Sequence, residues 1–426
     1  MSSARQLPGE APAPVIDSPA PVTEPPAPVT EPPAPVIDMP VPPPGSMGPP
    51  EEYARLRESC PVARVRLPMG ATAWYVTRYD DVRDLIADSR LIRPTINDWP
   101  PRPDEPTDRG PALTTMMELN GPQHTALRKA LAEPFSVRTI QRRLPRIRRS
   151  ADRLLDAFAD GDRPGDLVGG YLEPFPLLVM CDLVGIPYED RDYFLPMADA
   201  ALGALVTLEE GRDVTRPLRE YIRALVDRKL REPDADLLTT LVRECGHGTL
   251  HEESVLSFGL SMLVAGYRTS TMFLGNAVVA LLTEPGRYAR LRDDRGLMPG
   301  AVEELLRYIP VMNGVVLLQA VEDIELRGRT IRAGDAVLPV IASANRDETA
   351  FPAADQLDLH RTANNHLAFG RGTHNCPGSH LARAELTVGL EALLDRLPHL
   401  HLTEERHPTW DDESPSKSPL TLPVGW

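Results

Sequence analysis

The stretch 252–283 constrains the fold of this chain more than any other segment. Its central part is apolar on nearly all sides, which is typical of a helix buried in the core of a large domain. At about 1.5 Å per residue, one helix of this length measures about 48 Å, enough to cross a whole domain. Amphipathic helical stretches dominate the rest of the chain, and strand-like sequence is confined to 63–67, 73–76 and 315–341. The sequence therefore predicts a mainly α fold with a small β annex.

Proline sets the first 48 residues apart from this domain. Of the 46 prolines in the chain, 17 lie within the first 50 residues. Four seven-residue units, starting at Ala13, Ala20, Ala27 and Ala34, carry two or three prolines each, which excludes a helix with a heptad repeat. We predict an extended or disordered tail over 1–48 and one catalytic domain over 49–426. The tail either keeps the protein in solution or docks to a proline-binding domain.

Charge and cysteine content exclude several classes of protein. With 46 basic and 61 acidic residues, the net charge of −15 argues against a general nucleic-acid-binding protein. None of the four cysteines forms a C-x-x-C pair, so neither a disulfide framework nor a cysteine-rich zinc site is expected. No stretch of 18 apolar residues predicts a membrane span, and the N-terminus lacks the apolar core of a signal peptide. We therefore expect a cytoplasmic protein with no nucleic-acid or membrane partner.

The segment from Phe369 to Gly378 carries the most specific chemical signal. It reads F-x-x-G-x-x-x-C-x-G, a pattern expected by chance in roughly 3 of ten thousand chains of this composition. Cys376 stands just before a predicted helix, where backbone N–H groups and the helix dipole favour the thiolate. Gly370, Gly372 and Gly378 permit close approach of the backbone to a flat ligand. A buried structural cysteine in a glycine-rich loop, the alternative interpretation, does not explain the flanking pattern.

These features suit a haem-thiolate site. N–H groups around the sulfur would donate hydrogen bonds that tune a bound iron, and a thiolate ligand favours O–O cleavage. The pattern resembles the haem-binding loop of the cytochrome P-450 family, and the resemblance, to soluble bacterial members, covers about residues 50–426. It implies the helix-rich cytochrome P-450 fold and one non-covalent haem b (iron protoporphyrin IX). Cys376 would be the iron ligand, and Phe369, Gly370 and Gly378 would belong to the loop that holds the cofactor.

A second match to the family lies upstream of this loop. Glu304 and Arg307 form an E-x-x-R, and this spacing puts both side chains on one face of a helix. E-x-x-R occurs five times in the chain, but only this copy lies in an apolar helix. In the family the motif forms an ion-pair network that holds the haem-binding core, and Arg361 matches its third member. Solvated surface charges are the alternative interpretation.

Three side chains match family residues that bind the haem propionates. His124 and Arg128 resemble the family's H-x-x-x-R, and the i,i+4 spacing directs both to one face of a helix. His366, ten residues before Cys376, matches a further propionate donor. Leu318 departs from the family, which often has arginine there as another donor. The resemblance therefore implies that His124, Arg128 and His366 anchor the propionates.

The centre of the long apolar stretch departs from the family at one position. Ala265, Gly266 and Thr269 match the oxygen-activating pattern, but Arg268 replaces its acidic residue. The hydroxyl of a helical threonine can bond the backbone and open a local kink with room for water. Arginine stays protonated, so it cannot pass protons as the acid would. Three roles for Arg268 remain open: it binds a substrate oxygen over the haem, assists peroxide cleavage, or forms a structural ion pair.

The resemblance implies a haem-thiolate monooxygenase or oxidase of secondary metabolism that uses O2 and electrons from a ferredoxin or flavodoxin. We predict an apolar or aromatic natural-product-type substrate, for example a cyclic dipeptide, modified by hydroxylation or by C–C or C–O coupling. A peroxide-using hydroxylase and a non-catalytic haem-binding sensor or scaffold are the alternatives. Four residues are candidates for substrate contact, with core packing as the alternative role of each: Val264, Tyr267, Met312 and Asn313.

Overall fold

The chain divides into two compact units, 1–34 and 35–426, and only the second is described below. In the computed structural model the described residues are 36–67, 70–94, 116–203, 208–311, 316–404, 406–412 and 416–426. They form a mainly helical fold with small β-sheets, which confirms the predicted fold class. Among these residues, no helix is long and apolar enough to cross a membrane.

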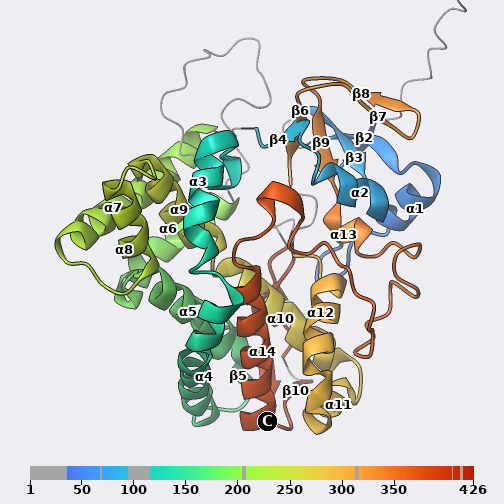
Figure 1. Ribbon diagram of the computed structural model, residues 1–426. Helices are drawn as coiled ribbons and strands as arrows, with labels where there is room; N and C mark the ends of the chain where they lie inside the picture. Colours follow the sequence, from blue (N-terminus) through green and yellow to red (C-terminus); the bar gives the residue numbers. More distant parts are fainter. Residues whose placement is uncertain are drawn as a thin grey trace, which may run out of the picture. The chain divides into compact units, whose positions relative to one another are not determined.

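Helices make up most of the unit (Figure 1). The α-helices are α1 (Glu52–Ser59), α2 (Tyr79–Leu85), α3 (Gly121–Ala132), α4 (Val137–Ala159), α5 (Pro174–Val184), α6 (Arg191–Gly203), α7 (Leu208–Arg231), α8 (Leu237–Gly246), α9 (Glu252–Ala265), α10 (Arg268–Thr283), α11 (Arg287–Asp293), α12 (Met298–Tyr308), α13 (Ile341–Ala344) and α14 (Ser379–Arg396). Short helical turns are η1 (Met116–Glu118), η2 (Val168–Leu172), η3 (Tyr188–Asp190), η4 (Arg295–Leu297) and η5 (Gly372–His374).

The strands form one larger sheet and three small ones. The larger sheet has the order β1 (Val36–Asp38), β2 (Val62–Arg66), β3 (Thr72–Val76), β9 (Ala336–Pro339), β6 (Leu318–Ala320) and β4 (Leu91–Ile92). The small sheets join β10 (His401–Leu402), β13 (Pro423–Gly425) and β5 (Gly165–Asp166); β11 (Thr409–Trp410) and β12 (Pro419–Thr421); and β7 (Ile324–Leu326) and β8 (Arg329–Ile331). Strands β2 and β3 pair in antiparallel fashion, in agreement with the strand-like stretches 63–67 and 73–76 of the sequence.

The long apolar stretch forms two helices rather than the single helix that was predicted. α9 ends at Ala265 and α10 begins at Arg268. The Thr269 hydroxyl donates a hydrogen bond of 2.9 Å to Ala265 O, a bond that commonly bends helices. A Cβ on Gly266 would lie 2.5 Å from Met262 O, so the break has room only for glycine. The break places Thr269 on the first turn of α10.

Helix α10 forms the centre of the core. Every residue over 270–281 is buried, and α10 packs against α5, α9, α11 and α14. Helix α14 packs in turn along α4 (Figure 1). Burying a large apolar side chain such as Phe273 or Leu274 contributes about 1.5–3 kcal/mol. The loop that carries Cys376 leads directly into α14, so this core fixes the start of the helix next to the cysteine.

The last part of the proline-rich segment packs on the domain, which corrects the boundary predicted at residue 48. Strand β1 pairs in parallel with β2, and its first pair joins Val36 and Arg64. Pro40 and Pro42 are buried, and the Gly45 N–H donates to Asp412 Oδ1 at 2.8 Å. Proline is tolerated beside an edge strand because its missing N–H falls outside the ladder. The rest of the predicted tail, 1–35, lies outside the described residues.

We predict that removing residues 1–34 leaves the melting temperature unchanged, whereas removing residues 1–48 lowers it by about 5 °C. The longer deletion removes β1, two buried proline rings and the Gly45–Asp412 bond, which together contribute about 2–3 kcal/mol. Calorimetry of the full chain and both shortened chains measures the difference. Equal melting temperatures for the two shortened chains would show that β1 does not stabilise the domain.

Candidate functional site

The Cys376 loop has a backbone shape that its glycines make possible. Gly370 and Gly372 have φ angles of 69° and 73°, in the left-handed region. A Cβ on Gly372 would lie 2.9 Å from Ala87 Cα, so a larger residue would push the loop off the end of α2. The Cys376 N–H donates to Phe369 O at 2.8 Å and closes the loop. The Arg383 guanidinium lies over the Phe369 ring, 4.6 Å from its centroid.

The surroundings of the Cys376 thiol act on its pKa in both directions. Burial has the largest effect and leaves the pKa raised overall, while a hydrogen bond from the Gly378 N–H and the charges of Arg128 and Arg383 offset part of that rise. A hollow of about 220 Å³ adjoins the loop, lined by Arg128, Leu131, Ala132, Phe135, Ser136, Asn375, Cys376, Pro377, Ser379 and His380. A thiol among positive charges and N–H donors is suited to binding metal as a thiolate.

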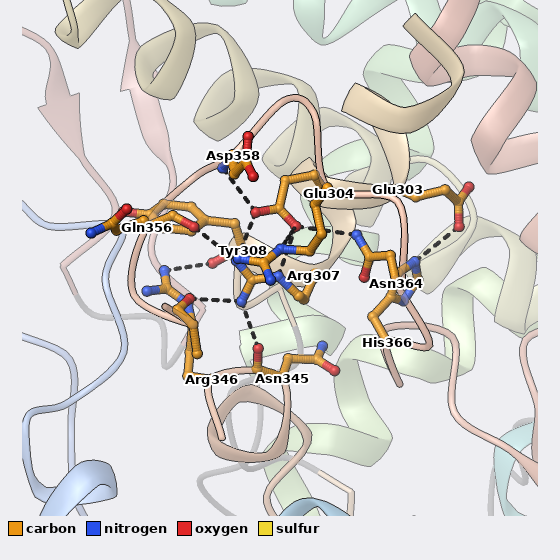
Figure 2. A network of polar contacts seen from close by, with 12 residues as sticks. Glu303, Glu304, Arg307, Tyr308, Asn345, Arg346, Gln356, Asp358, Asn364 and His366 are labelled. Atoms are coloured by element: carbon orange, nitrogen blue, oxygen red, sulfur yellow. Dashed lines mark hydrogen bonds and ion pairs between the residues drawn. The ribbon is translucent and has the colours of Figure 1, made fainter. Parts of the chain in front are cut away.

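Glu304 and Arg307 form a buried, bidentate ion pair on α12 (Figure 2). Arg307 Nε donates to Glu304 Oε2 and Arg307 Nη2 to Glu304 Oε1, both at 2.8 Å. Arg361 Nε lies 2.9 Å from Glu304 Oε2, so the three side chains that the sequence predicts to form a network do meet. The carboxylate also accepts bonds from Asp358 N at 2.9 Å and Asn364 Nδ2 at 3.1 Å.

Arg307 connects this helix to the irregular chain that precedes the cysteine loop. Its Nη1 donates to the carbonyl oxygens of Asn345, at 2.8 Å, and Ala354, at 2.7 Å. Its Nη2 donates to Gln356 O at 3.0 Å (Figure 2). The side chain of Asn345 then accepts a bond of 2.7 Å from Leu367 N, at the start of the loop. The network therefore sets the path of the chain as far as the segment that holds Cys376.

His124 and Arg128 lie together on α3, as their spacing predicts, and both meet the cysteine loop. The His124 ring stacks on the His374 ring at a centroid distance of 4.2 Å. Arg128 donates to Asn375 O at 2.8 Å and to the side-chain oxygen of Asn375. Burial, followed by the charges of His124, Arg93 and Arg128, lowers the pKa of His374 to about 4. These groups form a donor-rich cluster on which an acidic ligand would be stabilised.

The structure does not support His366 as a propionate donor. Its Nε2 lies 3.1 Å from Glu303 Oε2, and its Nδ1 accepts a bond of 3.1 Å from Ala368 N (Figure 2). Arg383 donates twice to the same Glu303 carboxylate, at 2.6 and 2.9 Å. Burial raises the pKa of Glu303, but the bonds from His366 and Arg383 outweigh it and lower the pKa to about 2. Both ring nitrogens are therefore already engaged within the protein.

His374, which sequence reasoning missed, is the histidine that meets the His124 ring. It stands two residues before Cys376, inside the loop motif itself, and its ring contacts that of His124. Its position in the motif was the available signal. The two imidazoles have different surroundings, because His366 contacts Glu303 whereas His374 contacts His124.

Arg268 forms ion pairs with two acidic residues. Its Nη1 lies 3.5 Å from Glu173 Oε1 and its Nε lies 3.7 Å from Asp199 Oδ1. The fully buried Tyr267 donates to the same Asp199 oxygen at 3.1 Å. Burial raises the pKa of Glu173, and Arg268 partly offsets that rise. A half-buried guanidinium needs counter-charges, and the structure supplies them, which favours the structural ion pair among the three predicted roles.

The remaining predicted residues divide into two groups. Ala265, Gly266 and Thr269 lie together at the break between α9 and α10, where each is partly accessible. Tyr267 is buried and bonded to Asp199, so it contacts the core rather than a substrate. The positions of Met312 and Asn313 and the Val264 side chain lie outside what the structure describes.

Comparison with known proteins agrees with this geometry. A sequence model of the cytochrome P-450 family matches residues 206–421. The chain is 40% identical over 379 residues to mycinamicin IV hydroxylase/epoxidase from Micromonospora griseorubida, covering 88% of this chain and 94% of the relative. It is 39% identical over 378 residues to nocardicin C N-oxygenase from Nocardia uniformis subsp. tsuyamanensis, with coverage of 88% and 94%. The chain belongs to the cytochrome P-450 family.

A solved structure extends the match to three dimensions. The mycinamicin VIII C21 methyl hydroxylase from Micromonospora griseorubida superimposes on this cytochrome P-450 with a TM-score of 0.82 at 34% identity, covering 88% of this chain and 96% of that one. The protein is therefore a cytochrome P-450 monooxygenase, and its family implies a haem cofactor. The residues present fit that group: Cys376 offers a thiol among N–H donors, and a cluster of basic side chains beside it has no acidic partner among the described residues.

A buried acid joins α10 to α14 in this cytochrome P-450, and sequence reasoning missed it as well. Glu385 is 1% exposed, and Ser270, the residue after Thr269, donates to its Oε2 at 2.7 Å. Burial raises the pKa of Glu385 to about 8, although the Ser270 bond lowers it. A glutamate within a helix is usually exposed, so no sequence signal set this one apart.

We predict that Arg307→Ala destabilises the protein by about 3–5 kcal/mol, because Glu304 would keep a buried charge without its bidentate partner. Arg55→Ala is the matched control, since Arg55 has the same i,i+3 relation to Glu52 with its side chain 73% exposed. The control should change stability by about 0.5 kcal/mol or less. Denaturant unfolding measures both variants. Similar losses for the two would contradict a structural role for the network.

Proposed function

We propose that this cytochrome P-450 transfers oxygen to a small apolar or aromatic natural product at a haem b that Cys376 ligates. The observation that carries the proposal is the Cys376 thiol, held in a closed loop beside the Gly378 N–H donor and the charge of Arg128. When bound, a haem with a thiolate ligand supplies one-electron and O2 chemistry and favours O–O cleavage. The protein contributes the binding, orientation and electrostatics.

The side chains around Cys376 take distinct parts in this proposal. Arg128, His124 and His374 would hold the haem propionates, since arginine and imidazole donors match carboxylates. The Glu304 network holds the start of the cysteine loop through Asn345, which is bonded to both Arg307 and Leu367. Thr269 lies at the helix break, and its hydroxyl donates to the carbonyl oxygen of Ala265. This is a suitable place to hold water and move a proton. The electrons would come from a ferredoxin or flavodoxin.

The relatives favour oxygen transfer over oxidative coupling. Their names describe a hydroxylase/epoxidase acting on mycinamicin IV and an N-oxygenase acting on nocardicin C. The missing acid at position 268 by itself would favour coupling, because coupling does not place oxygen in the product. The ion pairs of Arg268 with Glu173 and Asp199 give that residue a structural reason to be arginine, which removes this support.

Cys376→Ala is predicted to abolish the red-shifted Soret band of the reduced carbon-monoxide complex that marks a thiolate ligand. Cys245→Ala, which removes a half-buried thiol on α8, is the control and should keep the band. The parent is then screened against bacterial natural products for shifts of the haem Soret band, and the products are analysed by mass spectrometry. Gain of one oxygen atom supports the proposal, whereas loss of two hydrogen atoms would replace it with coupling.

We predict that Arg268→Ala leaves the substrate-induced Soret shift unchanged and lowers stability by about 1 kcal/mol, because its partners are partly exposed. Arg268→Glu should destabilise more, since it adds a third carboxylate beside Glu173 and Asp199. Spectral titration with the identified substrate and thermal melting measure both effects. If Arg268→Ala bound the substrate tenfold more weakly in the spectral titration at unchanged stability, the Arg268 side chain would contact the substrate instead.

A further inference from the structure

Arg93 is half-buried, and its guanidinium has no partner among the described residues. Its Nε is buried with no hydrogen-bond acceptor, and within the described residues no carboxylate forms an ion pair with it. Burial lowers the pKa of Arg93 to about 10, and no neighbouring charge offsets this. An arginine stays ionised even then, and an uncompensated buried charge is costly. Other arginines buried in the described part of the chain have their counter-charge within the protein, as Arg307 has Glu304, which leaves Arg93 available to an anionic ligand.

The backbone around Arg93 is fixed relative to α3. The Arg93 N–H donates to Asn120 Oδ1 at 3.1 Å, and Asn120 Nδ2 donates to Arg93 O at 2.8 Å. Asn120 is the residue before α3, the helix that carries His124 and Arg128. The two backbone bonds therefore position Arg93 against the start of the helix whose side chains reach the Cys376 loop. Because they use only the backbone of residue 93, a substitution of its side chain leaves them intact.

Four basic side chains converge at this point. Arg93 is bonded to Asn120 at the start of α3, His124 lies on the first turn of that helix, and the His374 ring stacks on the His124 ring at 4.2 Å. Arg128 acts on the same two rings and bonds to Asn375, next to Cys376. Within the described part of the chain, no aspartate or glutamate pairs with any of the four. Two guanidinium groups and two imidazoles without an acid suit a ligand with carboxylates.

Strand register relates Arg93 to Leu318. Strands β4 and β6 are antiparallel, with Leu91 opposite Ala320 and Ile92 opposite Gln319. Arg93 directly follows β4, and continuing this register by one residue would place it opposite Leu318; directly opposed residues project from the same face. Leu318 is 5% exposed and has no group that donates a hydrogen bond. A guanidinium at position 93 or at position 318 would therefore reach the same face of the sheet.

We propose that Arg93 donates to a propionate of the haem and takes the place of a donor at position 318. This inference rests on the proposed function, since it needs a haem on Cys376. It adds Arg93 to His124, Arg128 and His374 as a residue that retains the cofactor. It also gives a reason for leucine at position 318, because the positive charge comes from the neighbouring strand.

The test is the rate at which the holoenzyme releases haem to an excess of apomyoglobin. Arg93→Leu should release haem about tenfold to a hundredfold faster, the loss expected for one hydrogen bond to a charged group. Arg90→Leu is the matched control, because Arg90 lies three residues away on the surface and pairs with Asp88. The control should release haem at the parent rate. The double variant R93L/L318R returns a guanidinium to the same face and should restore retention to within about threefold of the parent.

The outcomes separate this inference from the proposed function. A parent protein without the thiolate-type carbon-monoxide band would contradict the proposed function and, with it, the role of Arg93. A parent with that band and an Arg93→Leu variant that releases haem at the parent rate would overturn only the role of Arg93. A double variant that releases haem as fast as Arg93→Leu would also overturn it, since the loss would then come from packing rather than charge.

Discussion

The buried carboxylate of Glu304 is the interaction on which the rest of the site depends. It is fully buried and is compensated by Arg307 and Arg361. Removing either arginine would leave a charge in a low-dielectric interior, which is far more costly than losing a surface pair. Arg307 uses its other N–H groups on carbonyl oxygens of the chain that leads to the cysteine loop. One buried charge thus connects α12 to the irregular chain between Asn345 and Arg361.

Charge balance distinguishes the two faces of this region. On the side of the Glu304 network, acids and bases are matched inside the protein, and Glu303 extends the match to His366 and Arg383. On the side of α3 and the cysteine loop, basic groups lie together with no acidic partner among the residues that the structure describes. The first arrangement holds a fold together, and the second leaves positive charge available to a ligand. The difference explains why two histidines eight residues apart, His366 and His374, have different roles.

The break in the long helix shows how local chemistry modifies a core element. Thr269 bonds back to Ala265, and Gly266 accepts the close approach of the preceding turn. Arg268, the first residue of α10, pairs with Glu173, just before α5, and with Asp199 on α6. The position that the family pattern gives to an acid therefore carries the opposite charge, and the acids stand on the facing segments instead.

The sequence by itself determined the helical fold class, the Cys376 loop and the pair of Glu304 and Arg307, because each depends on spacing within one element or one loop. A period near 3.6, a run of glycines and an i,i+3 pair are local signals that tertiary contacts do not alter. The resemblance to the family added Arg361, which no local spacing would connect with Glu304.

Only the tertiary structure decided what depends on neighbours distant in the chain. The partner of Arg268, the engagement of His366 by Glu303, the burial of Glu385 and the pairing of β1 with β2 join residues between 28 and 115 positions apart. The lack of a counter-charge for Arg93 among the described residues also depends on the tertiary structure, because it is decided by which side chains lie near its guanidinium. A sequence states which groups can ionise, but whether each finds a counter-charge is fixed only when the chain has folded.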